Sequence, residues 1–309
     1  MTLEQLRHFV AIVDNGYSAS AAADAEETTQ PRVSKTLAML EVTLKLKLFD
    51  RKGKRIVKLT QAGEEVLEHA RRVLGALDNI QIVSSDYTGS IGGTLTLATT
   101  HTQARYVLPQ AIGPFLKRFP NVRLQLKQGN PVQCANWVAS GEADLAIATE
   151  ALAEHHDLAT LPSYTWNRVV IAPKTHALAK VHKLDLKTLA AYPIITYDGT
   201  FTGRSAIDAA FKQAALVPNV VLTALDSDVI KTYVRLGLGV GIVAEMAVDQ
   251  KQDDDFVVLP VGHIFPAATT RIGLRRGASL RLTVYEFIGH FAPKITKKMV
   301  QTALQAKKN

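Results

Sequence analysis

Hydrophobic residues recur at helical spacing over residues 1–60. Thr2 and Gln5 form a capping-box pattern ahead of a first helix, whose apolar face carries Leu3, Leu6, Phe9, Val10 and Val13. Asn15-Gly16 ends that helix, and a short alanine-rich helix is expected over 18–25. A third helix begins in "TTQPRVSKTLAMLE", with a threonine suited to N-capping and Pro31 in the first turn. Its buried stripe is Val33, Leu37, Leu40 and Leu44.

This order of helices is typical of a helix-turn-helix domain, whose last helix enters the major groove of DNA. The polar side of the third helix then carries side chains able to contact bases, namely Gln30, Arg32, Ser34 and Lys35. A plain three-helix bundle with a solvated polar face would have the same pattern. The helical pattern alone therefore leaves both interpretations open.

The segment "LFDRKGKRIVKLT" favours the DNA-binding interpretation. It has two short strand-like runs around Lys52-Gly53-Lys54, a turn that projects basic side chains as a wing does. Between Lys45 and Lys58 the only acid is Asp50. The candidate phosphate contacts of the wing are Arg51, Lys52, Lys54 and Arg55.

A long helix is expected to follow the wing, over about 60–87. Its apolar positions alternate at spacings of four and three, which is a heptad pattern: Val66, Ala70, Val73, Leu77, Ile80, Ser84 and Tyr87, widened by Leu67 and Leu74. The pattern favours a dimerising helix, although packing of the same stripe against its own domain is the alternative. The glycine-rich "TGSIGG" at 88–93 is then a hinge.

From Thr94 onward, strand-like and helical segments alternate, which predicts an α/β fold with mostly parallel sheets. The strand-like segments are "TLTLAT", "VRLQLKQG", "ADLAIAT", "RVVIAP", "PIITYD", "NVVLTA" and "VGIVA". Because so long a region is large for one doubly wound unit, we expect two lobes with a cleft between them.

Hydroxyl-rich segments follow several of these strands. "ATTHTQARYVLP" places Thr99, Thr100, Thr102 and Gln103 between a strand end and a helix N-terminus, where open α/β sheets bind ligands and helix dipoles favour anions. Thr149 ends a second strand, and Thr200 and Thr202 follow a third. These side chains can converge on one small oxyanion; ordinary helix capping explains them equally well.

Composition limits the function classes. Formal net charge is +8 and hydrophobic residues make up 47% of the chain, which suits a globular protein and agrees with, but does not require, a polyanionic partner. There is no export signal or membrane-spanning run, and the lone Cys134 cannot form an internal disulfide, so a cytoplasmic location is expected.

Enzyme and receptor alternatives have less support. The chain has no GxGxxG, P-loop, HExxH or GxSxG arrangement, and no metal is expected at the adjacent His155-His156. We expect His101 to be a local hydrogen-bond partner rather than a general base. A solute-binding receptor would explain the lobes but leaves residues 1–60 without a role.

The chain resembles the LysR-type transcriptional regulators through "TTQPRVSKTLAMLE" and "LFDRKGKR…LTQAG". It resembles their CysB/Cbl subfamily, regulators of sulfur assimilation, through "ATTHTQARYVLP", "ADLAIATEAL", "LPSYTWNRVV", "FTGRSAIDAAF", "DSDVIKTYVRLGLGVGIVAEMAVD" and "HFAP". The likeness spans nearly the whole chain. It implies a winged helix-turn-helix, a dimerising linker helix and a Rossmann-like, two-lobed effector domain of periplasmic-binding-protein type.

The resemblance also implies domain limits and partners. The limits are 1–60 (winged helix-turn-helix), 61–87 (linker helix), 88–93 (hinge), 94–163 with 267–292 (lobe I), 164–266 (lobe II) and 293–309 (C-terminal helix or tail). The implied partners are promoter DNA, RNA polymerase and copies of the chain in a homotetramer, with no membrane and no cofactor. The implied effector is sulfate, thiosulfate, N-acetylserine or adenylylsulfate.

Residue roles carry over in the same way. The resemblance places DNA contacts at Thr29, Gln30, Pro31, Arg32, Ser34 and Lys35. It places the oxyanion site at Thr100, Thr102, Gln103, Thr149 and Thr202, with Trp166 near the pocket.

Several positions depart from the family pattern. Glu26 replaces a packing leucine, so the second helix is expected to be shorter or shifted, and Arg32 adds a possible base contact. The loop before Phe201 also differs, which leaves the identity of the effector open. Glu150 is expected to face away from the site or to pair with Arg204 or another base.

Overall fold

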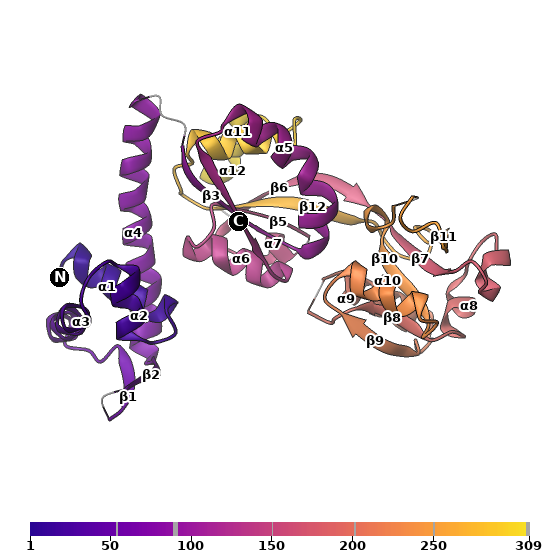
Figure 1. Cartoon of the computed structure of the whole chain (residues 1–309), viewed down its shortest axis with the longest axis horizontal. Coiled ribbons are helices and arrows are strands. Elements are labelled where there is room, and N and C mark those ends of the chain that lie inside the picture. Colours follow the sequence, from indigo (N-terminus) through magenta and orange to yellow (C-terminus); the bar gives the residue numbers. More distant parts are fainter. Residues whose placement is uncertain (54, 89–91, 150, 201, 250, 307–309) are drawn as a thin grey trace. The chain divides into compact units, whose positions relative to one another are not determined.

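The computed structural model describes residues 1–53, 55–88, 92–149, 151–200, 202–249 and 251–306. The chain divides into two compact units, Met1–Thr88 and Gly89–Asn309 (Figure 1). Each unit has its own hydrophobic core. In the described part of the chain, no helix combines the length and the apolar character that a membrane span requires.

The N-terminal unit contains the expected helices α1 (Leu3–Asp14), α2 (Ala19–Ala25) and α3 (Gln30–Leu44). The predicted capping box is present, with Thr2 and Gln5 hydrogen-bonded reciprocally. Thr29 occupies the N-cap of α3, but its side chain makes no capping hydrogen bond. Glu26 is the exposed C-cap of α2, so ending the helix at Ala25 spares the carboxylate from burial.

The wing is an antiparallel pair of strands, β1 (Phe49–Lys52) and β2 (Arg55–Leu59), as expected. Gly53 turns between them with a φ of 64°, a left-handed conformation that glycine adopts without strain. Phe49, Ile56 and Leu59 of these strands join Phe9 and Leu37 in one core. The wing is therefore packed against the three helices.

Helix α4 (Gln61–Thr88) begins directly after the wing. Ala70 is buried in the N-terminal core, and Val66, Leu67 and Leu74 pack against it. The first part of the predicted heptad stripe thus serves its own domain, which was the alternative interpretation. Later positions differ, because Val73 and Ile80 are 43% and 68% exposed. The side chains of Ser84 and Tyr87 lie outside the described residues.

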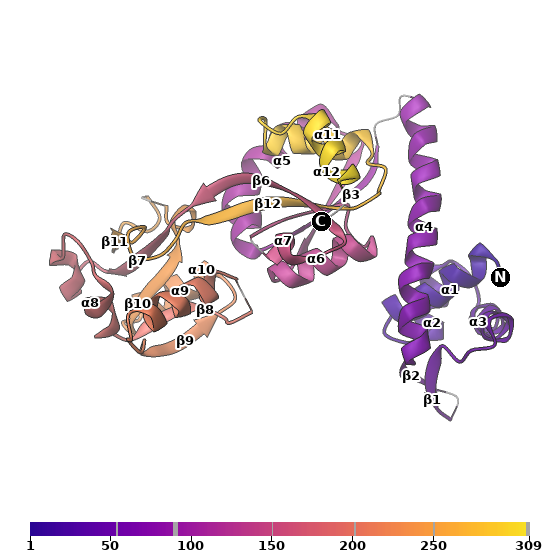
Figure 2. The same cartoon turned by 180° about the vertical axis from the view of Figure 1, so that it is seen from behind.

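Lobe I of the larger unit is built on a five-stranded sheet in the order β4-β3-β5-β12-β6. Its strands are β3 (Gly93–Thr99), β4 (Val122–Gln128), β5 (Leu145–Ala148), β6 (Leu158–Trp166) and β12 (Ala268–Arg275). The helical elements are the π-helical turn η1 (Gln103–Val107), α5 (Leu108–Arg118), α6 (Pro131–Ser140), α7 (Ala151–Glu154), α11 (Leu282–Phe291) and α12 (Lys297–Gln305). Figures 1 and 2 show α5, α11 and α12 on one face of this sheet and α6 and α7 on the other.

Lobe II has a second five-stranded sheet, in the order β11-β7-β10-β8-β9. Its strands are β7 (Arg168–Pro173), β8 (Ile194–Tyr197), β9 (Val220–Ala224), β10 (Val240–Ala244) and β11 (Phe256–Pro260). Its helical elements are η2 (Ala177–Lys180), α8 (Leu186–Ala190), α9 (Thr202–Gln213), α10 (Ser227–Arg235) and η3 (Glu245–Ala247). The α/β fold with two lobes is confirmed.

The prediction of mostly parallel sheets is wrong. The pairs β3–β4, β3–β5, β8–β9 and β8–β10 are parallel, but β5–β12, β12–β6, β10–β7 and β7–β11 are antiparallel. The long strands β6 and β12 run side by side toward lobe II (Figure 1). Their mixed burial follows neither strict alternation nor a continuous apolar run, which is why the pattern missed them.

The lobe limits also move slightly. Strand β6 continues to Trp166, which pairs with Ala268, so lobe I extends beyond the expected limit at 163. Helix α12 places Val300 in the core of lobe I, with Ala303 and Leu304 packed against it. The segment after 292 therefore contains the expected C-terminal helix, and this helix packs on lobe I.

Candidate functional site

The N-terminal half of α3 exposes the polar side chains predicted to contact DNA. Gln30, Arg32 and Lys35 are exposed, and Ser34 is half-buried. The Gln30 side-chain amide donates a hydrogen bond to the Ser34 hydroxyl at 2.8 Å. Arg32 Nε lies 2.7 Å from Glu4 Oε1 of α1. Both partners are well exposed, so this ion pair can open at little cost when another acceptor is near.

Glu41 of α3 ties the recognition helix to the wing. Its carboxylate is 5% exposed, accepts a hydrogen bond from the Leu48 backbone N–H at 2.9 Å, and lies 3.7 Å from Arg51 and 3.5 Å from Lys47. Arg51 therefore has an internal partner, which the sequence did not reveal. Lys52 and Arg55 are exposed on the wing, while Lys54 lies outside the described residues.

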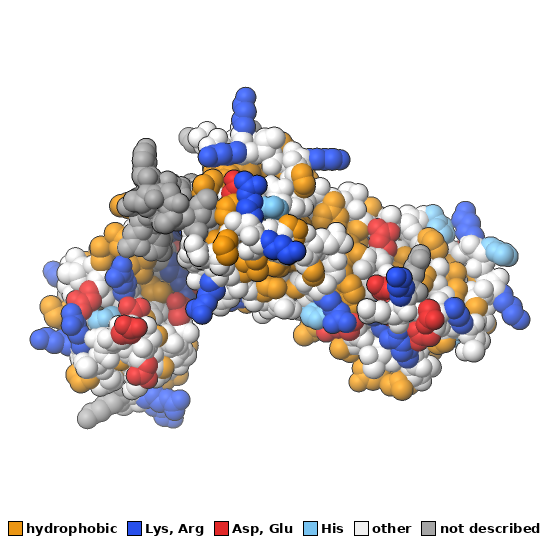
Figure 3. Space-filling view, turned by 45° about the horizontal axis from the view of Figure 1, so that its top comes forward, with side chains coloured by type: hydrophobic (Ala, Val, Ile, Leu, Met, Phe, Trp, Pro, Cys, Tyr) orange, Lys and Arg blue, Asp and Glu red, His pale blue; other side chains and the backbone are white. Residues whose placement is uncertain are grey.

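Basic side chains are not confined to this unit. Lys and Arg also protrude from the surface of the larger unit (Figure 3). The net charge of the chain is therefore a weak marker of DNA binding, and the placement of Lys52, Arg55 and the α3 side chains carries the argument instead.

In lobe I, the predicted effector segment joins β3 to η1 and divides by role. Thr99 is fully buried and donates a hydrogen bond to the Ile147 carbonyl at 2.8 Å, so its hydroxyl links β3 to β5. Thr100 is 7% exposed, and its carbonyl accepts from the Ala104 N–H. Thr102 is half-buried and faces lobe II.

The side chain of Gln103 has hydrogen-bond partners within lobe I. The Tyr164 hydroxyl donates to Gln103 Oε1 at 2.5 Å, and Gln103 Nε2 donates to Thr270 Oγ1 at 3.2 Å. Trp166 Nε1 donates a hydrogen bond to the same threonine hydroxyl at 3.1 Å. Burial raises the pKa of the Tyr164 hydroxyl. Gln103 and Trp166 therefore belong to one internal network that fixes η1 against β6 and β12.

Lobe II supplies hydroxyls that the sequence analysis missed. Tyr197 at the end of β8 lies 2.7 Å from Ser227 Oγ, and its oxygen accepts a hydrogen bond from the Ala244 N–H at 3.0 Å. Ser227 Oγ in turn lies 3.5 Å from Thr102 Oγ1. Complete burial raises the pKa of Tyr197, so its hydroxyl stays protonated.

A recognisable signal did mark Ser227. Ser227 begins α10 shortly after the end of β9. This repeats the pattern of the predicted threonines, which lie between the end of a strand and the start of a helix. The hydroxyls of Thr102, Tyr197 and Ser227 come together between the two lobes, where strand ends and helix starts of both lobes meet.

The other predicted effector residues are only partly located. Thr149 follows β5, and its carbonyl accepts from the Leu152 N–H at 3.1 Å. Thr202 begins α9, but its side chain lies outside the described residues, as does the whole of Glu150. Arg204 pairs with Asp208 within α9, and its guanidinium also donates to the Tyr197 carbonyl.

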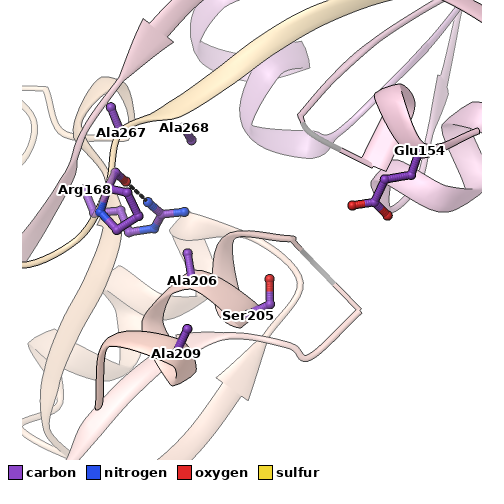
Figure 4. Close-up of a pocket in the computed structure, with 8 residues that line it drawn as sticks. Glu154, Arg168, Ser205, Ala206, Ala209, Ala267 and Ala268 are labelled. Atoms are coloured by element: carbon purple, nitrogen blue, oxygen red, sulfur yellow. Dashed lines mark hydrogen bonds between the residues drawn. The ribbon is translucent and has the colours of Figure 1, made fainter. Parts of the chain in front are cut away.

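A cleft of about 490 Å³ opens between the lobes (Figure 4). Glu154 lines it from lobe I, while Ser205, Ala206 and Ala209 line it from α9. Its remaining wall is Arg168 with the crossover residues Pro266, Ala267 and Ala268. The buried Arg168 guanidinium donates to the Pro266 carbonyl and lies over the Trp166 ring, so the cleft adjoins the network around Gln103.

Two clusters bring histidine and carboxylate groups together in the described residues. His155 and His156 stack their rings at an exposed turn, with His156 3.3 Å from Asp157. His101 Nδ1 lies 4.0 Å from Asp228 Oδ2, which is too long for the hydrogen bond expected of it. Because Arg105 and Lys231 also lie beside Asp228, that carboxylate is better suited to cationic side chains than to a metal ion.

Comparison with known proteins agrees with both units. Residues 3–64 match the bacterial regulatory helix-turn-helix protein model of the lysR family, and residues 88–295 match the LysR substrate binding domain. The transcriptional regulator SsuR of Burkholderia cenocepacia is 46% identical over 99% of both chains. The regulator CysB of Haemophilus influenzae is 44% identical over all of this chain and 95% of that protein.

A solved structure gives the same result for the larger unit. The cofactor-binding domain of the Cbl transcriptional regulator is 40% identical, covers 70% of this chain and 95% of its own, and superposes with a TM-score of 0.67. The alternatives of an enzyme and of a solute-binding receptor are thereby set aside. With both of its units matched, the chain belongs to the LysR family of bacterial transcription regulators.

Proposed function

We propose that the chain regulates genes of sulfur assimilation and that its effector is sulfate or a related sulfur compound. The observation that carries this proposal is the meeting of the Thr102, Tyr197 and Ser227 hydroxyls between the two lobes. The likeness to CysB, Cbl and SsuR supports the sulfur-related role. DNA contacts would come from Thr29, Gln30, Pro31, Arg32, Ser34 and Lys35 and from the wing.

The chemistry of the hydroxyl cluster favours sulfate over phosphate. Near neutral pH sulfate only accepts hydrogen bonds, whereas hydrogen phosphate retains a proton and needs an acceptor. Hydroxyl groups and helix N–H groups can all act as donors toward an anion. Since one N–H of the Gln103 amide is donated to Thr270, its second N–H and the hydroxyls of Thr100 and Thr102 are the candidate donors in lobe I.

The cleft lined by Arg168 and α9 is separate from the hydroxyl cluster and is large enough for a larger effector. About 490 Å³ falls within the range of pockets that hold small organic ligands. N-acetylserine and adenylylsulfate therefore stay candidates beside sulfate and thiosulfate. An unrelated small anion acting on the same architecture is the alternative, and Arg168 and Ser205 in the wall of the cleft are the polar groups that would favour it.

We further propose that the chain acts in the cytoplasm as a homotetramer on promoter DNA and contacts RNA polymerase there. The exposed Val73 and Ile80 on α4 support pairing of two copies through this helix. Two-fold pairing would present two recognition helices to successive turns of the operator.

Isothermal calorimetry and thermal shift on the full chain test the effector proposal. The ligands are sulfate, thiosulfate, N-acetylserine, adenylylsulfate, an alkylsulfonate, phosphate and a simple carboxylate. We expect a sulfur compound to bind and to raise the unfolding temperature, with sulfate about tenfold or more tighter than phosphate.

Two variants locate the site. Thr102→Val removes a hydroxyl from the cluster and should weaken binding about tenfold, because a hydrogen bond to a charged group contributes roughly 1.5 kcal/mol. Thr94→Val, at the exposed opposite end of β3, is the matched control and should bind as the wild type does. Equal affinity for phosphate and sulfate would refute the donor argument, and binding of the carboxylate alone would favour the alternative.

A further inference from the structure

The two lobes contact each other where η1 of lobe I faces the first turns of α10 in lobe II. Arg105 Nε lies 3.0 Å from Asp228 Oδ2, and Thr102 Oγ1 lies 3.5 Å from Ser227 Oγ. These contacts flank the hydroxyl cluster. The segments that carry the proposed effector groups are thus also the segments that join the lobes.

Tyr106 makes the closest of these contacts between the lobes. Its hydroxyl donates to Asp228 Oδ1 at 2.7 Å and accepts from Lys231 Nζ at 3.0 Å. Lys231 Nζ also lies 5.2 Å from the centre of the Tyr106 ring, within the range of a cation–π contact. Lobe II therefore satisfies both the donor and the acceptor of this hydroxyl, and we call Asp228 and Lys231 the tyrosine socket.

The tyrosine socket is held in place within lobe II. Lys231 Nζ donates to Asp253 Oδ2 and to the Ala247 carbonyl, each at 3.0 Å, and Arg235 lies 2.8 Å from the other oxygen of Asp253. Lys231 and Asp253 side chains are 7% and 2% exposed. Burial opposes the charge on Lys231, but the hydrogen bonds that its ammonium group donates to Tyr106 and Asp253 hold its pKa above the usual value. The ammonium group is therefore present and oriented at neutral pH.

Tyr106 is equally fixed to the proposed effector groups in lobe I. It lies in η1, a π-helical turn that starts after Thr102 and contains Gln103. The network of Gln103 with Tyr164 and Thr270 anchors this turn to its sheet. Isolated π-helical turns occur frequently at functional sites. A displacement of lobe II that removed the socket would therefore act on the turn that follows Thr102 directly.

We propose that Tyr106 is a positioning residue that couples effector binding to closure of the lobes, by seating η1 in the tyrosine socket of Asp228 and Lys231. This inference rests on the proposed function only for the identity of the ligand. With Tyr106 seated, Thr102 meets Ser227 and Tyr197, which completes the donor set. With Tyr106 unseated, lobe I alone presents its hydroxyls.

The coupling has a measurable consequence. The apparent dissociation constant equals the intrinsic constant divided by the fraction of molecules in the closed state. Tyr106→Phe retains the ring and removes both hydrogen bonds of the hydroxyl. We expect it to lower the closed fraction and to weaken sulfate binding about tenfold.

Single-molecule energy transfer on the full chain measures closure directly. Donor and acceptor dyes are placed at K117C in lobe I and K212C in lobe II, both exposed helix positions. The native Cys134 is buried and its pKa is raised to about 12, so it does not compete for the dyes. Labelled chain is mixed with excess unlabelled chain, so that each assembly carries one dye pair.

Matched variants separate coupling from a general loss of stability. Tyr285→Phe removes a hydroxyl from α11 of lobe I, away from the socket, and should match the wild type. Asp228→Ala removes the acceptor of the Tyr106 hydroxyl and also the partner of Arg105, so it should open the lobes at least as much as Tyr106→Phe does. Because the two variants remove the same hydrogen bond, the effect of the double variant should be smaller than the sum of the two single effects.

Support requires less energy transfer in Tyr106→Phe without ligand, about tenfold weaker sulfate binding, and recovery of the closed state at saturating sulfate. Unchanged energy transfer, or altered transfer with unchanged affinity, would overturn the coupling. If the wild type does not bind sulfate but Tyr106→Phe still opens the lobes, the socket stands and the sulfate proposal fails.

Discussion

At the scale of single residues, the buried carboxylates make the sharpest demands on their neighbours. Glu41 accepts the Leu48 N–H and faces Arg51 and Lys47. Glu41→Ala leaves that buried N–H without an acceptor and should destabilise the N-terminal unit by about 1–3 kcal/mol. Glu41→Gln keeps the acceptor oxygen and should cost less than about 1 kcal/mol. Urea unfolding of both variants checks this, and equal losses would contradict the hydrogen-bond argument.

Asp253 predicts a dependence of stability on pH. Burial alone would raise its pKa, but the Asp249 N–H, Lys231 and Arg235 hold it below the usual value. A carboxyl whose pKa is lowered by folding stabilises the protein above its unfolded pKa of about 4, and this contribution disappears as pH falls through the folded pKa. Asp253→Asn should therefore lower stability at neutral pH by about 3–5 kcal/mol. The deficit should shrink below about pH 4, as thermal unfolding across pH 3–7 would show; a constant deficit would argue against the ionic role.

The same scale separates what the sequence could predict from what it could not. The capping box of Thr2 and Gln5 was predictable because both partners lie within one turn. The hydrogen bonds of Gln103 with Tyr164 and Thr270 were not predictable, because those residues are distant in the chain and meet only through the register of β6 and β12. The sequence around Arg51 likewise did not predict that Glu41 would lie beside it.

At the scale of elements, α4 shows how one apolar stripe can serve two purposes. A heptad pattern predicts which side chains are buried but not what they pack against. The sequence therefore could not separate Val66 and Ala70, which pack in their own domain, from the exposed Val73 and Ile80. Gly63 was also unexplained by the pattern. A side chain there would collide with the Leu48 carbonyl, so glycine permits close packing of α4 on the wing segment.

This division of α4 predicts an effect on self-association. Ile80 is 68% exposed, so Ile80→Glu places a charge on the exposed part of the stripe. It should raise the dimer dissociation constant at least tenfold without unfolding the chain. Gln61→Glu adds the same charge at the exposed start of the helix and should have no such effect. Sedimentation velocity over a range of concentrations measures both. If Ile80→Glu associates as the wild type does, the interface between two copies of the chain lies outside this part of α4.

At the scale of the whole molecule, the two units must be linked energetically if an effector controls DNA binding. Thermodynamic linkage requires that the factor by which effector changes operator affinity equals the factor by which operator changes effector affinity. For a coupling of about 1–3 kcal/mol this factor is roughly 5–150. Fluorescence anisotropy of operator DNA with and without effector, and calorimetry of effector with and without operator, should give the same factor at one salt concentration. In Thr102→Val the effector concentration that produces half of the change in operator affinity should rise about tenfold, because the variant binds effector about tenfold more weakly. An unchanged effector concentration in this variant would place the controlling site outside the hydroxyl cluster.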